Sequence, residues 1–271
     1  MNDPTLSPAR RAYLKSRQRE AWRINAIRIG FLFAFLGLWE FAGQLGWIDV
    51  FIVSCPSRVL RTICVLWSSG DLLRHLGTSC VETVIGFILG TVIGVWIAVG
   101  LWWSRFAAKV LEPYLVVLNA LPKTALGPIF IVWIGAGTES IIAMALAISV
   151  FVTIMNMYVG FCGVEEEKLR LMKTLGASKA QTLFKLVIPA NYATLFNTLR
   201  VNVGLSWVGV IMGEFLVSKA GIGYLIVYGS QVFNMDLVMA SVLLLAAAAV
   251  VMYQLVLLLE RGLKSKMGVT E

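Results

Sequence analysis

The amino-acid sequence predicts an all-α membrane protein with about six transmembrane helices, and both composition and hydropathy pattern support this. Hydrophobic residues make up 59% of the 271 residues and charged residues only 14%, against about 25% charged residues in soluble domains. The mean hydropathy is +0.83. Because a helix needs about 20 apolar residues to cross a bilayer, we expect spans at residues 28–47, 78–101, 110–134, 140–161, 190–217 and 237–259.

The positively charged residues indicate how these spans are oriented, because cytoplasmic loops carry an excess of Lys and Arg. With a cytoplasmic N-terminus, the outer segments and the spans together hold only Arg58, Arg61, Arg74, Lys219, Arg28, Lys123 and Arg200. The other 16 of the 23 Lys and Arg lie in the inner segments, at residues 1–27, 102–109, 162–189 and 260–271. We therefore expect a multi-pass protein with both termini in the cytoplasm.

This topology divides the chain into four parts. Residues 1–27 are a basic cytoplasmic tail, and the apolar stretch after it has the length of an uncleaved anchor rather than of a signal peptide. Residues 28–77 hold the first span and an extracytoplasmic segment, in which Val59, Ile63 and Leu66 predict a short interfacial helix. The transmembrane core follows at residues 78–259, with a C-terminal tail at 260–271.

A polar segment at residues 164–188 interrupts the apolar windows and carries the signals of two short helices. Gly176 stands where the first helix is expected to end, in a left-handed conformation that glycine adopts at little cost. Ser178 and Gln181 have the spacing of a capping box that opens a second helix. Pro189 is expected to end that helix. A structured, charged segment in so apolar a chain indicates contact with something outside the membrane. The alternative is an ordinary cytoplasmic loop that happens to be helical.

The frame of this segment resembles the signature loop of permease subunits in bacterial ATP-binding-cassette importers. Nine residues separate Gly176 from Leu186, and an Ile-Pro pair ends the frame at 188–189. The family's Glu-Ala-Ala triplet is replaced here by Arg-Leu-Met at residues 170–172.

Two flanking blocks are similar to the nitrate, sulfonate and taurine branch of that family. The first is Asn-Ala-Leu-Pro-Lys-Thr-Ala-Leu-Gly-Pro at residues 119–128. The second combines Gly-Glu-Phe at 213–215 with Ala-Gly-Ile-Gly-Tyr at 220–224. With the signature loop, the resemblance covers residues 54–262.

The resemblance implies a type I importer permease in the bacterial cytoplasmic (inner) membrane, which moves a small anionic or polar solute by alternating access. The implied partners are two copies of a cytoplasmic ATPase that hold ATP and Mg, an extracytoplasmic solute-binding protein, a second permease copy in a homodimer, and membrane lipid. In this reading the 164–188 loop docks on the ATPase. The candidate coupling residues are Arg170, Lys173, Thr174, Leu175, Gly176, Ala177, Ser178, Lys179 and Pro189.

Polar residues at membrane depth are candidates for the translocation pathway, because they are costly there unless paired or hydrated. Prolines in the third span also predict a broken helix that lines a cavity or a moving contact. The candidates are Asn119, Pro122, Lys123, Arg200, Asn202, Ser206 and Glu214. The alternatives are that Arg200 reaches the inner interface, Glu214 pairs with a neighbouring helix, and Lys123 pairs with a carboxylate such as Glu82 or Glu214.

Glycines at four-residue spacing indicate where helices pack closely, because small residues let two backbones approach in lipid. Gly86, Gly90 and Gly94 lie on one face of the second span, and Gly209 and Gly213 repeat the spacing in the fifth. We expect both faces to be helix contacts.

The sequence has no constellation for catalysis. It lacks a phosphate-binding glycine-rich loop, and its four cysteines and single histidine have no metal-site spacing. We expect no enzyme activity, no metal and no cofactor on this chain. The net charge of +8 arises from Lys and Arg in the predicted inner segments, and this distribution argues against a nucleic-acid-binding surface. The alternatives are an ion-coupled secondary transporter, a membrane enzyme or scaffold, and a permease for a neutral vitamin precursor.

Overall fold

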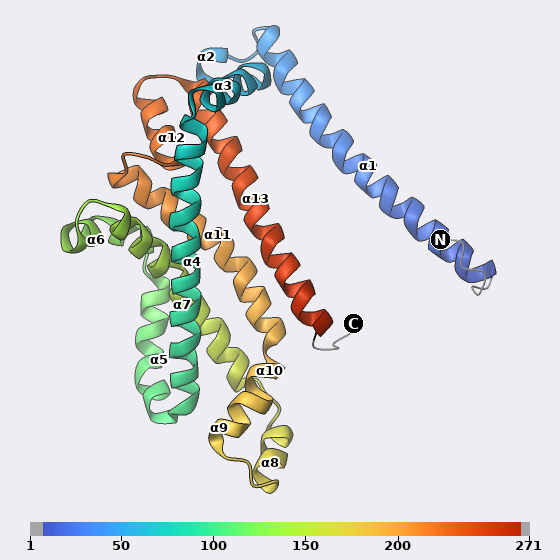
Figure 1. Cartoon of the computed structure of the whole chain (residues 1–271), viewed down its shortest axis with the longest axis vertical. Helices are drawn as coiled ribbons and strands as arrows, with labels where there is room; N and C mark the ends of the chain where they lie inside the picture. The colour runs from blue at the N-terminus through green and yellow to red at the C-terminus, as the bar shows by residue number, and fades with distance from the viewer. Residues whose placement is uncertain (1–7, 267–271) are drawn as a thin grey trace.

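The computed structural model describes residues 8–266, which form helices joined by short turns (Figure 1). In chain order the helices are α1 (Pro8–Gln44), α2 (Val50–Val53), α3 (Pro56–Ser69), α4 (Asp71–Trp103), α5 (Arg105–Ala120), η1 (Lys123–Leu126), α6 (Gly127–Ile134), α7 (Thr138–Cys162), α8 (Glu166–Thr174), α9 (Lys179–Thr182), the π-helical turn η2 (Leu183–Val187), α10 (Ile188–Ala190), α11 (Tyr192–Val217), α12 (Ile222–Gln231) and α13 (Met235–Lys266).

The helices confirm the predicted fold class. Within residues 8–266, five helices are long and apolar enough to cross a membrane: α1 from Trp22, α4, α7, α11 and α13. A sixth span is counted if α5 and the η1–α6 piece form one broken crossing. The predicted third span at 110–134 is therefore not one continuous helix: it bends by 90° at the break that contains Pro122, where proline removes a backbone donor.

Helices α4, α7 and α11 form the centre of the bundle, and their contacts confirm the packing role of the glycines. A Cβ added at Gly86 would lie 2.6 Å from Ala145 Cβ, and one at Gly94 would lie 2.5 Å from Thr153 Cβ, both on α7. Helix α11 approaches the same residue of α7, because a Cβ at Gly209 would lie 2.4 Å from the Cα of Ala145. Larger side chains would force these backbones apart.

Helix α1 stands apart from this bundle and touches it only near its C-terminal end (Figure 1). None of its apolar window is buried. The contacts lie at Trp39, whose Nε1 donates to the carbonyl of Ser54 over 3.2 Å, and at Glu40, which accepts from Ser57. The helix begins at Pro8, so the described part of the predicted basic tail, residues 8–27, is the N-terminal part of α1.

The predicted interfacial helix is present as α3, between the first two long helices. Val59 faces inward with 3% of its surface exposed. An ion pair of 2.7 Å between Arg58 and Asp236 joins α3 to the start of α13, and Ser54 also donates to Asp236 over 2.7 Å. These contacts fix the α2–α3 end of the molecule.

The segments that the sequence assigns to one side of the membrane lie toward the end of the molecule opposite α2 and α3. The α8–α10 segment, the end of α13 and the start of α1 all point away from α2 and α3 (Figure 1). The α4–α5 turn also lies there, because Lys179 binds the carbonyl of Trp103. Which end faces the cytoplasm stays a prediction.

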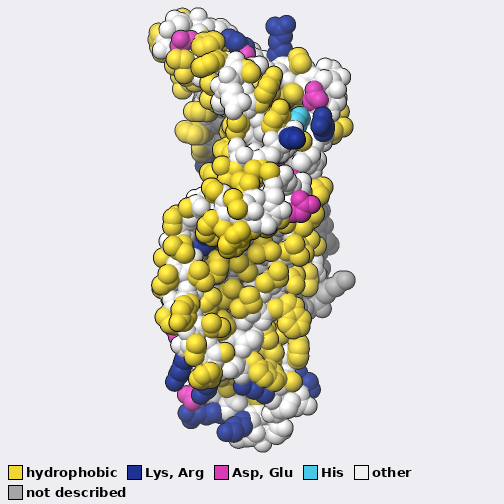
Figure 2. All heavy atoms as spheres, turned by 90° about the vertical axis from the view of Figure 1, so that its left-hand side faces the viewer, with side chains coloured by type: hydrophobic (Ala, Val, Ile, Leu, Met, Phe, Trp, Pro, Cys, Tyr) yellow, Lys and Arg dark blue, Asp and Glu magenta, His cyan; other side chains and the backbone are white. Residues whose placement is uncertain are grey.

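The surface also follows the predicted distribution. Hydrophobic side chains cover the middle of the face in Figure 2, and most charged side chains lie toward its two ends. This is the pattern expected of a protein whose middle section lies in the hydrocarbon core of the membrane.

Candidate coupling segment and translocation pathway

The segment between α7 and α11 folds as the sequence predicts around Gly176. Helix α8 ends at Thr174, and Gly176 has φ +74°, the left-handed conformation that favours glycine. Ser178 caps α9: its Oγ accepts from the N–H of Gln181 over 3.2 Å, while the Gln181 side chain accepts from the N–H of Ser178 over 2.8 Å. The capping box is confirmed. It satisfies N–H groups at the start of α9.

The prediction that Pro189 ends the second helix is wrong. After α9 the chain widens into the π-helical turn η2, and Pro189 lies in the next helical turn, α10. The proline has no N–H, so a wider turn before it costs the helix little hydrogen bonding. Asn191 interrupts the helix instead. Its side chain donates to the carbonyl of Val187 over 2.9 Å before α11 begins.

The inner face of the segment is held on the ends of the long helices. Leu183 and Val187, 2% and 0% exposed, pack with Ala98 of α4 and with Met157 and Phe161 of α7. The segment is thus seated on two of the three central helices and continues into the third, α11.

Lys179 adds a polar anchor to this seat. Its ammonium donates to the carbonyl of Trp103 over 2.5 Å and lies 5.9 and 5.4 Å from the ring centres of Trp102 and Trp103. A cation at the C-terminus of a helix is stabilised by its free carbonyls, so Lys179 ties the segment to the end of α4.

The outer face of the segment exposes large apolar side chains beside charged ones. Leu171, Leu175 and Phe184 are 59%, 72% and 67% exposed. Arg170 pairs with Glu166 along the helix over 2.9 Å, a solvated pair that contributes little stability. The remaining candidates Lys173, Thr174 and Ala177 lie on α8 or in the turn after it.

The break in the third span brings Asn119 and Lys123 together. The Lys123 ammonium donates to the backbone carbonyl of Asn119 over 2.8 Å and is 3.4 Å from Asn119 Oδ1. It also lies 5.9 Å from the ring centre of Phe151. Among the described residues it forms no ion pair with a carboxylate. The pairing with Glu82 or Glu214 is therefore not seen. Asn119 and Pro122 are exposed.

The polar candidates on α11 lie in seams between helices. Asn202 is fully buried and donates to Thr91 of α4 over 3.0 Å and to Thr153 of α7 over 2.7 Å, so one amide joins the three central helices. Ser206 is also fully buried, with no hydrogen-bond partner for its hydroxyl. Arg200 pairs with Glu260 of α13.

Glu214 holds the start of the short helix α12. It accepts from the N–H of Gly223 and from the hydroxyl of Ser79, both over 2.5 Å. Ser79 accepts from the N–H of Ile222 over 2.7 Å, and His75 accepts from the N–H of Gly221 over 3.0 Å. No role was predicted for His75 or Ser79 from the sequence. Their four-residue spacing places both side chains on one face of α4, but it does not indicate which groups they bind.

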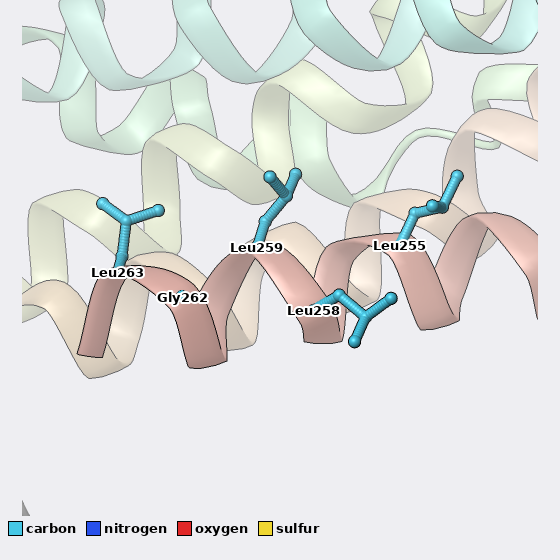
Figure 3. A pocket seen from close by; sticks show the side chains of 5 residues that line it. All are labelled: Leu255, Leu258, Leu259, Gly262 and Leu263. Carbon is cyan, nitrogen blue, oxygen red and sulfur yellow. The ribbon is translucent and has the colours of Figure 1, made fainter. Parts of the chain in front are cut away.

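A hollow on α13 is too apolar to recognise a polar solute. It has a volume of about 540 Å³ and is lined by Leu255, Leu258, Leu259, Gly262 and Leu263. Figure 3 shows three of these leucines pointing to the same side of the helix, as residues four apart do, with Leu258 turned away from them. Such a surface suits lipid chains.

Apolar helices packed through glycines, a broken span and a rigid polar segment define a multi-pass transport subunit of the membrane. The chain belongs to the family described as the binding-protein-dependent transport system inner membrane component, which it matches over residues 90–268. It is therefore a permease subunit of a binding-protein-dependent ABC importer, located in the cytoplasmic membrane.

Individual relatives agree with this family. The chain is 27% identical to the putative aliphatic sulfonates transport permease of Bacillus subtilis, over 91% of this chain and 88% of the relative. It is 27% identical to the formylaminopyrimidine transport permease of Halalkalibacterium halodurans, over 72% of this chain and 77% of the relative. The inward-facing MetNI methionine ABC transporter has the same fold, with a TM-score of 0.62 at 16% identity, over 72% of this chain and 97% of that one.

Proposed function

We propose that this permease couples ATP hydrolysis on a separate cytoplasmic ATPase to solute passage, and that residues 164–188 form the contact. The observation that carries the proposal is the two-sided build of the segment. Its inner side is fixed by Leu183, Val187 and Lys179, while its outer side exposes Leu171, Leu175 and Phe184. A rigid segment outside the membrane with exposed apolar side chains is the anatomy of a protein interface.

The same contacts supply a mechanism. A displacement of the segment acts on α4 through the Trp103 carbonyl and on α7 through Met157 and Phe161. It acts on α11 directly, because α10 continues into it through the Asn191 turn. These helices are the closely packed centre of the bundle, so they move as a unit. Alternating access then follows from tilting this unit.

The assembly we propose is a homodimer with two ATPase copies, which hold ATP and Mg, and an extracytoplasmic solute-binding protein. Five or six membrane-spanning helices from a single chain are too few to surround a translocation pathway comfortably. Helix α1 reaches away from its own bundle with no buried apolar window, which leaves the bundle open to a second copy.

For the pathway we propose the break at Asn119, Pro122 and Lys123. The ammonium of Lys123 has no carboxylate partner among the described residues and is held at the end of α5 by Asn119. This favours an anionic or polar solute over a neutral vitamin precursor. Contacts of the other candidates support a positioning role, in which they shape the pathway from within the helix seams: Arg200, Asn202, Ser206 and Glu214.

Photo-crosslinking tests the docking contact without removing a stabilising group. p-Benzoylphenylalanine at Leu175 should crosslink to the ATPase in the assembled importer, because this side chain is 72% exposed on the outer face. The matched control is Phe51, 59% exposed on α2 at the opposite end. A crosslink to the ATPase from position 51 and none from 175 would disprove the assignment.

A further inference from the structure

A second polar feature lies at the end of the bundle opposite the coupling segment. A cavity of about 240 Å³ opens between α4, the start of α7 and the α11–α12 turn. Its lining is rich in oxygen atoms, from one carboxylate, three hydroxyls and the backbone at the helix ends. The residues are Thr78, Glu82, Ala136, Gly137, Thr138, Ile141, Val217, Ser218, Lys219 and Ala220.

Glu82 is the unusual member of this lining. It is 2% exposed, and its Oε2 atom has no hydrogen-bond partner. A buried carboxylate oxygen without a partner is expensive. The neighbouring Glu214 differs, because Ser79 and the N–H of Gly223 donate to its two oxygens. The remaining hydrogen bonds of Glu82 are with the side chains of Thr138 and Glu214, and they leave its Oε2 atom without a partner.

No side-chain cation balances Glu82. Among the described residues neither Glu82 nor Glu214 forms an ion pair. Lys219 lines the same cavity, but it is exposed and its ammonium is not paired with Glu82. The N-terminal end of α7, which begins at Thr138 beside Glu82, favours the ionised carboxylate through the helix dipole.

The structure assigns this cavity, in our interpretation, to one monovalent inorganic cation of the sodium or potassium kind, bound by Glu82. Hard cations take oxygen ligands, and the lining offers the carboxylate with the hydroxyls of Thr78 and Thr138. Ends of broken helices and unwound carbonyls coordinate sodium in other transporters. Among the described residues, no three His, Cys, Asp or Glu side chains are placed so that they could hold a metal ion together, so the site does not fit a transition metal. The inference is independent of the coupling segment.

The test is a thermal unfolding titration of the purified, assembled importer. Sodium or potassium chloride replaces choline chloride at constant ionic strength, so that only the cation changes. A ligand that binds only the folded state raises the unfolding midpoint, and we expect a saturable rise of about 5 °C. Glu82→Gln should lose the rise. Glu139→Gln, which changes an exposed carboxylate at the same end, should keep it.

Other outcomes overturn the proposal. A wild type that responds to pH but to neither cation would hold a shared proton between Glu82 and Glu214. A cation response that appears only in Lys219→Ala would show that Lys219 is the natural counter-charge. A response that survives in Glu82→Gln would belong to another site. If Glu82→Gln does not assemble, Thr138→Val replaces it as the test variant, because it keeps the carboxylate and removes one hydroxyl. The midpoint should then rise only at a higher sodium concentration than in the wild type.

Discussion

At the residue scale, polar side chains inside this membrane protein occupy two kinds of surroundings. Asn202 and Glu214 are buried and bonded across helix seams, where they fix the relative positions of α4, α7 and α11. Lys123 instead lies at a helix break, where its ammonium contacts the oxygens of Asn119 and the ring of Phe151. A charge held this way needs water or an anion nearby, which separates a pathway residue from a packing residue.

Replacing Lys123 should affect transport more than assembly. We expect Lys123→Met to lower the uptake rate about ten-fold or more, with assembly and basal ATP hydrolysis kept, since a lost charge-assisted contact is worth about 1.5–3 kcal/mol. Uptake into proteoliposomes measures this. Lys109→Met, an exposed lysine near the start of α5, is the matched control. Loss of assembly in Lys123→Met alone would instead indicate a packing role.

Gly176 tests the geometry of the coupling segment. No atom lies within 4 Å of a Cβ built there, but φ is +74°, so a branched side chain strains the backbone by about 1–2 kcal/mol without any clash. We expect Gly176→Val to lose solute-stimulated ATP hydrolysis and Gly176→Asn to keep it, because Asn tolerates this conformation. Equal coupling in both variants would show that the turn is not required.

At the element scale, close approach of glycine faces decides how the bundle packs. Gly209 brings α11 against the backbone of Ala145, whereas Gly204 on the same helix has nothing within 4 Å. We expect Gly209→Ala to cost about 1–3 kcal/mol of stability by overpacking. Gly204→Ala should be neutral or stabilising by up to about 1 kcal/mol through helix propensity. Unfolding midpoints of the purified variants compare the two, and equal midpoints would contradict this packing.

The elements also show where sequence reasoning succeeds and where it stops. Hydropathy windows placed the long helices, and local signals at Gly176 and Ser178 placed the short ones, because both depend on nearby residues. The prolines predicted a break in the third span, but neither its 90° angle nor the π-turn before Pro189 was predicted, since a proline allows several backbone paths. The cross-helix bonds of Asn202 and His75 depend on tertiary packing, which spacing along one helix does not reveal.

At the scale of the whole molecule, the topology is defined by which connections between helices lie at the end of the coupling segment and which lie at the opposite end. The α2–α3 end, the α6–α7 turn and the α11–α12 turn lie away from the coupling segment (Figure 1). In a background without native cysteines, Ser178→Cys should react with a membrane-impermeant maleimide only after the membrane is opened. Lys219→Cys should react in intact cells, as the positive-inside rule requires. Reversed labelling would invert the orientation and remove the docking contact.

The central claim is that this chain is the permease of an ATP-driven importer, and ATP hydrolysis in proteoliposomes tests it most directly. The chain is reconstituted with its ATPase, and the solute-binding protein is added loaded or empty. We expect hydrolysis to rise when the loaded binding protein is present, and to be lower with the empty protein or without the permease. Solute uptake that an ion gradient drives in the absence of ATP, with hydrolysis unaffected by the binding protein, would contradict the claim.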